Sequence, residues 1–261
     1  MTTRMRLHAL SCGRIGLPGD YLWPGWGDAT LVDCSVGMFV LEHPGGLLLF
    51  DTGSAPETAS SVAAHWGEAV AAAFPYRVDR ADIIDRQLAA LGFRPADVRQ
   101  VVLSHLHLDH AGGMKLFPEA TFFVQAQELL DAFWPLPGFA EGYYLPADLL
   151  PCCGFRMIKL EGDVDLFGHG SIRLLSTPGH ATGHQSLALT LPHTGPVILP
   201  ADACFNPVAL ERRLPPGAPL PAPSAWKASL ERVAAAVQGG ATPLWSHLPW
   251  GEWERTPRVW E

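Results

Sequence analysis

The chain has 261 residues, of which 48% are hydrophobic and 17% are charged, and its net charge is −8. This balance is typical of a globular protein with a sizeable core, and it excludes an intrinsically disordered chain. The acidic charge disfavours non-specific binding to nucleic acid, and no apolar run reaches membrane-spanning length. We expect one domain over residues 1–261 that binds neither nucleic acid nor membranes, and a homodimer stays open.

The five cysteines are scattered and form no Cys-x-x-Cys pair. An odd number with this spacing favours free, mostly buried thiols in a reducing compartment over a disulfide framework. The apolar stretch near the first residues is too short for a signal peptide. A cytoplasmic location is therefore expected.

The first half of the chain predicts strands that alternate with helices. Apolar runs and turn residues mark the strands, and Ala-rich helical spacing marks the helices. Residues 13–30, rich in Gly, Pro and Trp, are expected to form a loop. The predicted strands are 5–12, 31–42, 46–51, 100–104 and 120–125, and the predicted helices are 55–73, 79–91 and 126–133.

The second half begins with an irregular segment, 134–155, whose length and Pro/Gly content are typical of a binding loop. A second Pro-rich piece runs over 207–223, and Ser224 is expected to cap a helix over 224–237. The predicted strands are 156–160, 171–176, 185–191, 196–201 and 242–246.

Each half of the chain thus contains its own set of predicted strands and helices, and no linker divides the two halves. Two sheets packed face to face, with helices outside, bury both sets. The sequence therefore predicts an α/β protein, an αββα sandwich of two packed mixed β-sheets flanked by helices.

The stretch from Ser104 to His110 gathers three imidazoles and one carboxylate directly after a predicted strand. His105, His107 and Asp109 alternate with leucines, so their side chains share one face of an extended segment. So many polar groups beside a buried strand would lack partners without an ion. Imidazole and carboxylate are good ligands for zinc and similar divalent ions. The stretch predicts a metal site.

Three later strands each end in a further ligand type, His180, Asp202 or His247. Asp51 follows an earlier strand in the same way. Taken singly, each could cap a turn or lie on the surface, but their common place at strand ends brings them toward the same rim.

The sequence Ser-His-Leu-His-Leu-Asp-His-Ala-Gly-Gly from Ser104, with Gly-His-x-x-Gly-His-Gln-Ser-Leu from Gly179, resembles the metallo-β-lactamase-fold superfamily. The similarity is closest to the N-acyl homoserine lactone lactonases and covers essentially the whole chain. It implies the αββα sandwich and a quorum-quenching hydrolase that opens a lactone by attack of a hydroxide held between two metal ions. The implied ligands are His105, His107 and His180 for one metal, Asp109, His110 and His247 for the other, and Asp202 as the bridge between them.

The resemblance also implies roles for residues around the metals. Asp109 would pass a proton to the leaving oxygen, and Asp51 and His184 would orient ligands, although His184 could equally cap its own turn. Phe205 stands where many members carry a tyrosine that bonds the substrate carbonyl. The candidate replacements are Tyr21, Tyr143 and Tyr144. The apolar and aromatic residues of 21–26 and 133–144, together with Phe205, are candidates for the wall that takes an acyl chain.

Zinc suits this ligand set best, and iron, manganese or cobalt are compatible with it. The substrate is expected to be a small lactone or ester. Alternatives on the same scaffold are an arylester or phosphotriester, a glyoxalase II-like thioester, or a β-lactam. From other classes, redox-active iron would need a flavin partner, and a binding module would keep the metals without turnover.

Overall fold

The structure, a computed structural model, describes residues 5–134, 143–215 and 223–261. Its larger sheet starts with a long hairpin, in which β1 (Arg6–Pro18) pairs antiparallel with β2 (Leu31–His43). The register shifts between Ser11 and Arg14, where Gly13 has a φ of 73°. This glycine bulge lets β1 continue to Pro18, so the prediction of a strand over 5–12 and a loop from residue 13 was wrong at this boundary.

The rest of the larger sheet places several strand ends at one edge. β3 (Gly46–Phe50) pairs antiparallel with β2 and parallel with β5 (Val98–Val102). The parallel series then continues, so these strands end on the same side of the sheet. Within the described residues the sheet has eight strands, completed by β4 (Tyr76–Arg77), β6 (Thr121–Gln125), β7 (Arg156–Leu160) and β13 (Val259–Trp260).

The smaller sheet has the order β12-β11-β10-β9-β8 among the described residues. Its pairs are antiparallel except for β11 with β12, which are parallel. β12 is shorter than the predicted strand over 242–246. The bounds are β8 (Val164–Asp165), β9 (Ile172–Ser176), β10 (Gln185–Leu191), β11 (Gly195–Leu199) and β12 (Thr242–Pro243).

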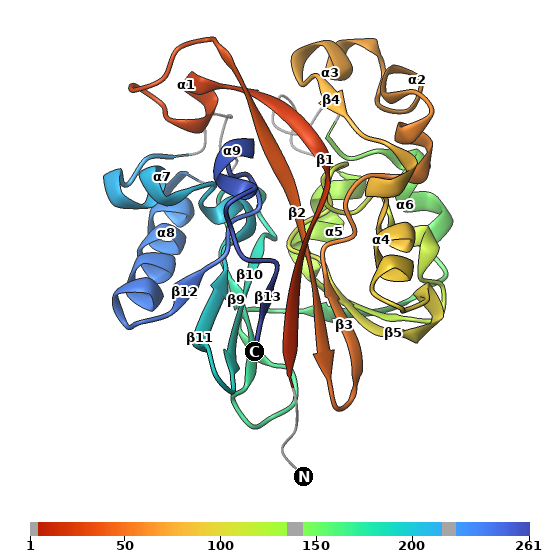
Figure 1. Ribbon diagram of the computed structural model, residues 1–261, viewed down its shortest axis with the longest axis vertical. Coiled ribbons are helices and arrows are strands. Elements are labelled where there is room, and N and C mark those ends of the chain that lie inside the picture. Colours follow the sequence, from red (N-terminus) through yellow and green to blue (C-terminus); the bar gives the residue numbers. More distant parts are fainter. Residues whose placement is uncertain (1–4, 135–142, 216–222) are drawn as a thin grey trace.

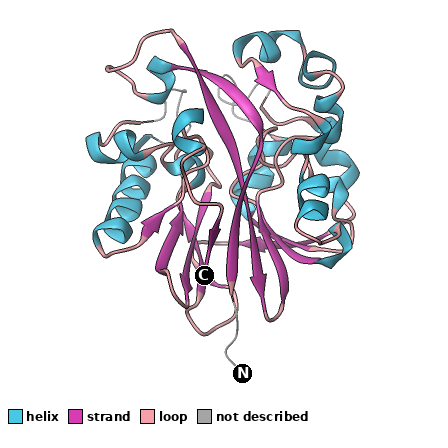
Figure 2. Cartoon of the chain, viewed as in Figure 1, coloured by secondary structure: helices cyan, strands magenta, loops and turns pink. Residues whose placement is uncertain are grey.

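Both faces of the larger sheet are buried. Successive side chains of β2 point to opposite faces of the sheet, and they pack into two different cores. Val36 and Met38 belong to a core that includes Ile84 of α4 (Ile84–Ala90), on the outer side. Phe39 belongs to the core that includes β10 of the other sheet. Figures 1 and 2 show the two sheets between helices on either side. The predicted αββα sandwich is confirmed.

Residues 55–73 do not form the single helix that their composition predicts. They form η1 (Pro56–Ala59), α2 (Val62–Trp66) and α3 (Glu68–Ala73). Gly67 has a φ of 88°, outside the helical region, and it separates α2 from α3. The break turns Trp66 inward, so that this side chain becomes part of the outer core.

Other helices also differ from the prediction in part. The Pro-rich segment 207–223 contains α7 (Pro207–Arg212), which Asn206 caps. Ser224 lies inside α8 (Pro223–Gln238), so its expected role as the N-cap was wrong. Residues 135–142 of the predicted binding loop lie outside the described residues. The remaining helices are α1 (Gly19–Leu22), η2 (Arg80–Asp82), η3 (Pro95–Asp97), η4 (Met114–Leu116), α5 (Ala126–Phe133), α6 (Pro146–Leu149), η5 (Leu150–Cys152), η6 (Ala201–Ala203) and α9 (Trp250–Trp253).

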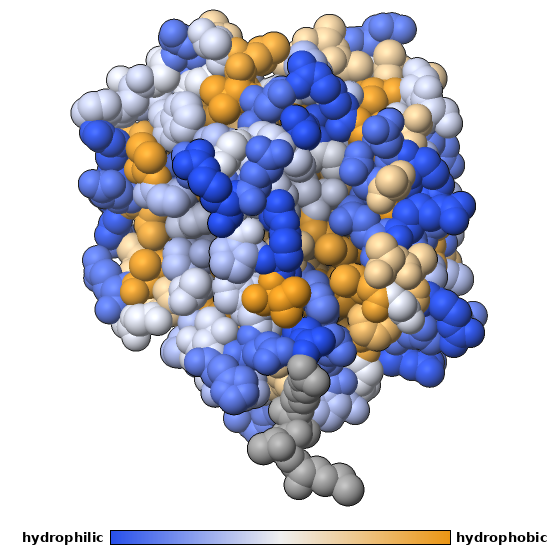
Figure 3. All heavy atoms as spheres, in the orientation of Figure 1, coloured by the Kyte–Doolittle hydropathy of each residue, from blue (hydrophilic) through white to orange (hydrophobic). Residues whose placement is uncertain are grey.

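All five cysteines are free and four of them are buried, as predicted. On the face shown in Figure 3, hydrophobic residues lie in separate patches among hydrophilic ones. None of the helices in the described ranges is both long and apolar enough to cross a membrane.

Candidate metal centre

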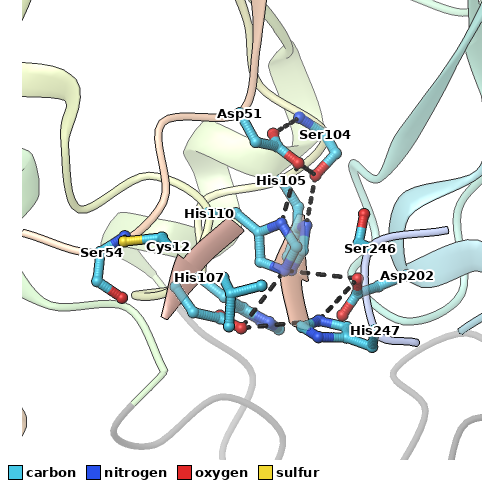
Figure 4. Close-up of polar contacts among 12 residues, drawn as sticks. Cys12, Asp51, Ser54, Ser104, His105, His107, His110, Asp202, Ser246 and His247 are labelled. Atoms are coloured by element: carbon cyan, nitrogen blue, oxygen red, sulfur yellow. Dashed lines mark hydrogen bonds and ion pairs between the residues drawn. The ribbon is translucent and has the colours of Figure 1, made fainter. Parts of the chain in front are cut away.

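The side chains that the sequence singles out as ligands converge from both sheets. Residues 105–110 follow β5, and His180 lies in the turn between β9 and β10. Asp202 follows β11, and His247 comes shortly after β12. Figure 4 shows the early histidines, Asp202 and His247 pointing toward one another. The layered fold therefore gathers strand ends that lie far apart in the sequence.

The motif loop is held tightly against the loop that follows β3. Thr52 N donates to His110 O at 2.7 Å, and Gly53 bridges Ala111. A Cβ atom at Gly112 would lie 2.4 Å from the backbone nitrogen of Ala55, so only glycine fits there. The small residues behind the histidines thus fix the path of the loop.

Ligand atoms of these side chains form three overlapping groups, within each of which all atoms lie within 4.8 Å of one another. Two of the groups are the sets that the resemblance assigns to the two metals. The Nε2 atoms of His105 and His110 and Oδ1 of Asp202 are buried without a hydrogen-bond partner among the described residues. Such atoms are costly unless an ion or another partner satisfies them. The groups are His105, His107 and His180; Asp109, His110 and His247; and His105, His110 and Asp202.

Asp202 lies between the two sets. Its Oδ1 is 3.4 Å from Nε2 of His110 and 3.4 Å from Nε2 of His247. Its Oδ2 is 3.4 Å from Nε2 of His180. Each oxygen thus faces a different set, which is the arrangement that a bridging carboxylate needs.

Asp51 contacts the His110 imidazole directly and the His105 imidazole through Ser104. Its Oδ2 accepts from Nδ1 of His110 at 2.9 Å and from Oγ of Ser104 at 2.7 Å. Nδ1 of His105 lies 2.9 Å from the same Ser104 oxygen and donates to it. Both Nε2 atoms are thereby turned toward the centre. Asp51 has a φ of 61°, a strained conformation for a residue with a side chain.

The remaining orienting contacts involve the second sheet. Nδ1 of His247 donates to the Ser35 carbonyl at 2.9 Å. Nε2 of His184 accepts from the Asp202 backbone N–H at 3.1 Å, and its Nδ1 donates to the Thr177 carbonyl at 3.1 Å. His184 therefore contacts the backbone of Asp202. The sequence indicated His184 and Asp51, but it carried no signal for Ser35, which lies within a strand.

The electrostatics of the cluster divide its histidines into two kinds. Burial, and then neighbouring imidazoles, hold the pKa values of His105 and His107 well below the ordinary value. Burial also lowers the pKa of His110, but the charges of Asp109 and Asp202 outweigh it and raise this pKa to about 10. Asp109 and Asp202 therefore favour a positive charge near His110. A proton on His110 supplies that charge in the metal-free protein, and a bound cation would supply it in place of the proton.

Glu128 is a buried carboxylate that sequence analysis missed. Its Oε1 accepts from Leu106 N at 2.8 Å and from Tyr144 Oη at 3.0 Å, and its Oε2 accepts from Gly183 N at 3.2 Å. Burial raises the pKa of its carboxyl to about 7. Glu128 thus ties the motif loop to the turn that carries His180. On α5 the charged Glu128 is buried while the apolar Leu130 is exposed, which is the reverse of what hydrophobic periodicity predicts. The sequence pattern therefore gave no signal for Glu128.

We expect Glu128→Gln to destabilise the metal-free protein by about 1–3 kcal/mol, because the new amide group opposes an N–H donor at Leu106 or Gly183. Urea unfolding of the metal-free protein measures this change. Glu119→Gln, on an exposed side chain, is the matched control and should leave the unfolding midpoint in place. Equal midpoints for the two variants would show that Glu128 does not hold the loops together.

A pocket of about 600 Å³, counted with its open solvent space, lies over the cluster. Tyr21, Tyr143 and Phe205 line it, whereas the Tyr144 hydroxyl is turned away and donates to Glu128. The other lining side chains among the described residues are apolar walls or cluster members, with no lysine or arginine. They are Ile15, Leu17, Trp66, Val70, Phe74 and Leu108, and His107, Asp109, His180, Asp202 and His247.

The segment 21–26 contributes less to this pocket than expected. Nε1 of Trp23 donates to Oδ1 of Asn206 at 3.0 Å. Trp26 is 65% exposed, with the Arg212 guanidinium over its ring. Within the described residues of this segment, Tyr21 alone lines the pocket. Helices α2 and α3 supply apolar wall in its place, through Trp66 and Val70.

The family model of the metallo-beta-lactamase superfamily matches residues 31–243. The chain belongs to this superfamily. Among its members, N-acyl homoserine lactonase AttM of Rhizobium radiobacter is 33% identical to the chain over 263 residues, which cover 99% of each protein. An N-acyl homoserine lactonase of a Bacillus species is 30% identical over 213 residues, 82% of this chain and 81% of that protein. The family resemblance of the sequence is confirmed.

Solved structures of the superfamily share this fold. A mutant of AiiA from B. thuringiensis, with N-decanoyl-L-homoserine bound at the active site, superposes with a TM-score of 0.84 at 26% identity and covers 97% of both chains. AidC, a dizinc quorum-quenching lactonase, has a TM-score of 0.69 at 17% identity, covers 99% of this chain and 91% of its own, and supports the fold alone.

Proposed function

We propose that the chain is a single-domain, two-metal hydrolase that opens the ring of N-acyl homoserine lactone-like substrates. The observation that carries the proposal is the pair of ligand groups with Asp202 between them, at the base of a largely apolar pocket. The similarity to proteins named N-acyl homoserine lactonase over nearly the whole chain supports the same reaction.

Two divalent ions held by these groups would supply a hydroxide at neutral pH and polarise the substrate carbonyl. The chain's own contribution includes Asp109, whose Oδ2 lies 3.5 Å from Nε2 of His110 and 3.7 Å from Nε2 of His247. This carboxylate also lines the pocket. It is suited to hold a proton and pass it to the ring oxygen as the ester bond breaks, which yields the hydroxy acid.

The pocket lining favours a neutral substrate with an apolar chain. Its walls are aliphatic and aromatic, and the described lining lacks any lysine or arginine that could pair with an anionic group. A β-lactam or a glutathione thioester carries carboxylates away from the reacting group, and the described lining offers no basic side chain to pair with them. These two alternatives are therefore disfavoured relative to a lactone, whereas a neutral arylester or phosphotriester is not.

Zinc, a homodimer and a cytoplasmic location also belong to the proposal. The imidazole and carboxylate donors suit zinc, and iron, manganese or cobalt are the alternatives that metal analysis compares. The five free thiols support a reducing compartment. Sedimentation of the purified chain tests the dimer.

Turnover of five substrates by the zinc-loaded protein tests the reaction: N-hexanoyl homoserine lactone, an arylester, paraoxon, nitrocefin and lactoylglutathione. We expect kcat/KM to be highest for the lactone, since it is neutral and its acyl chain fits the apolar walls. Rapid turnover of another substrate with no lactone opening would overturn the proposal. The chelator-treated protein is the control and should be inactive until metal is restored.

A further inference from the structure

A phenyl ring covers the candidate metal centre on its pocket side. The Phe205 ring lies edge-on to His180 and His247, with ring centroids 5.8 Å and 5.4 Å apart. This wall is apolar and offers no hydrogen-bond donor to a substrate oxygen. A substrate carbonyl that enters above the ligand groups therefore needs its donor from another side chain.

Tyr21 lies directly against this ring. Its ring stacks on Phe205, with centroids 5.7 Å apart and planes 20° apart, and packs edge-on against Phe74 at 5.8 Å. These two contacts fix the plane of the phenol. The Tyr21 hydroxyl has no hydrogen-bond partner among the described residues, although Tyr21 lines the pocket. Burial, and then Tyr143, Asp202 and Asp109, raise the pKa of this hydroxyl well above its ordinary value, so it lies in the field of both carboxylates.

The other three tyrosines of the chain are less suited to this task. The Tyr76 hydroxyl donates to the Cys12 carbonyl, and the Tyr144 hydroxyl donates to Glu128. Tyr143 packs against His107, with ring centroids 5.3 Å apart, and makes no ring contact with Phe205. Tyr21 is thus the phenol that stacks on Phe205, the ring that contacts His180 and His247.

This inference rests on the proposed lactonase function. We propose that Tyr21 is a catalytic residue whose hydroxyl donates a hydrogen bond to the carbonyl oxygen of the bound lactone, while Phe205 supplies the apolar wall. The oxygen gains negative charge as water adds to the carbonyl carbon, so the bond strengthens in the transition state. Its loss lowers kcat more than it raises KM.

The stacked pair allows the hydroxyl to be moved from one ring to its neighbour. With N-hexanoyl homoserine lactone and zinc-loaded protein, we expect Tyr21→Phe to lower kcat about a hundredfold, with KM nearly unchanged and full metal content. Adding Phe205→Tyr to Tyr21→Phe should restore much of kcat, because the phenol returns to the adjacent ring. Calorimetric binding of the product N-hexanoyl homoserine is a readout apart from turnover, and Tyr21→Phe should weaken it.

Each other outcome overturns a defined part of the argument. A wild type that opens no lactone contradicts the proposed function itself. If the wild type is active, an unchanged kcat in Tyr21→Phe overturns the role of Tyr21 alone. A change confined to KM, or a loss of kcat in Tyr143→Phe in place of Tyr21→Phe, does the same. Metal analysis separates these results from a misfolded variant, which would lose zinc and would not be rescued by Phe205→Tyr.

Discussion

Asp202→Ala is expected to lower lactone opening on the order of a thousandfold, the largest single loss in the site. Its two oxygens face different ligand sets, with Oδ1 at 3.4 Å from His110 and from His247, and Oδ2 at 3.4 Å from His180. Alanine removes the carboxylate that lies between the two sets. It also leaves the positive charge that gathers at His110 and His247 without its central partner.

Metal content should change together with activity. We expect purified Asp202→Ala to hold fewer than two zinc ions per chain by elemental analysis, whereas Glu119→Ala, on an exposed carboxylate, should match the wild type. A variant that retained two ions and full turnover would show that Asp202 does not bridge them. Circular dichroism of both variants establishes whether the fold is intact.

The convergence of the candidate ligand side chains was predictable because each of them lies shortly after a strand or within the motif. A strand end is visible in a sequence as an apolar run followed by a polar residue, as at Asp51 and Asp202. Stacked sheets bring such ends to one rim, so the fold class and the candidate site supported each other. His184, directly before β10, was singled out by the second motif, but its contact with the Asp202 backbone was not predictable.

The parts that could not be predicted depend on contacts between distant segments. Glu128 of α5 accepts hydrogen bonds from the backbone of Leu106 and of Gly183, which lie in two other segments. The Ser35 carbonyl of β2 accepts from His247, which follows a strand of the other sheet. No local pattern encodes such a partner. Gly67 is a different case, because it was visible within an Ala-rich segment, but only the folded chain shows that its φ is positive.

The binding surface was the least predictable part. Three tyrosines had equal claims to the substrate, and the sequence could not show that Tyr144 is occupied by Glu128 while Tyr21 stacks on Phe205. Side-chain direction in loops and in a single-turn helix such as α1 follows from packing, which composition does not specify.

Metal affinity is expected to rise with pH, by about tenfold for each pH unit and each proton that the metal displaces. In the metal-free protein the pKa of His110 is about 10, since the charges of Asp109 and Asp202 outweigh burial. His110 therefore keeps its proton at neutral pH, and a metal ion must remove it. From pH 6 to pH 9 this one proton predicts a gain of about a thousandfold in zinc affinity.

Competition with a fluorescent zinc chelator, corrected for the chelator's own titration, measures this slope. The raised pKa of His110 also stabilises the folded metal-free protein, but this effect weakens as the pH rises. It is fully present below about pH 6.5 and is lost as the pH rises through about 10. Asp51→Asn removes one of the charges that favour the protonated imidazole, so the affinity curve should level off at a lower pH. A zinc affinity that stayed constant from pH 6 to pH 9 would mean that His110 is neutral before the metal binds, and that the carboxylates around it do not gather positive charge at this side of the site.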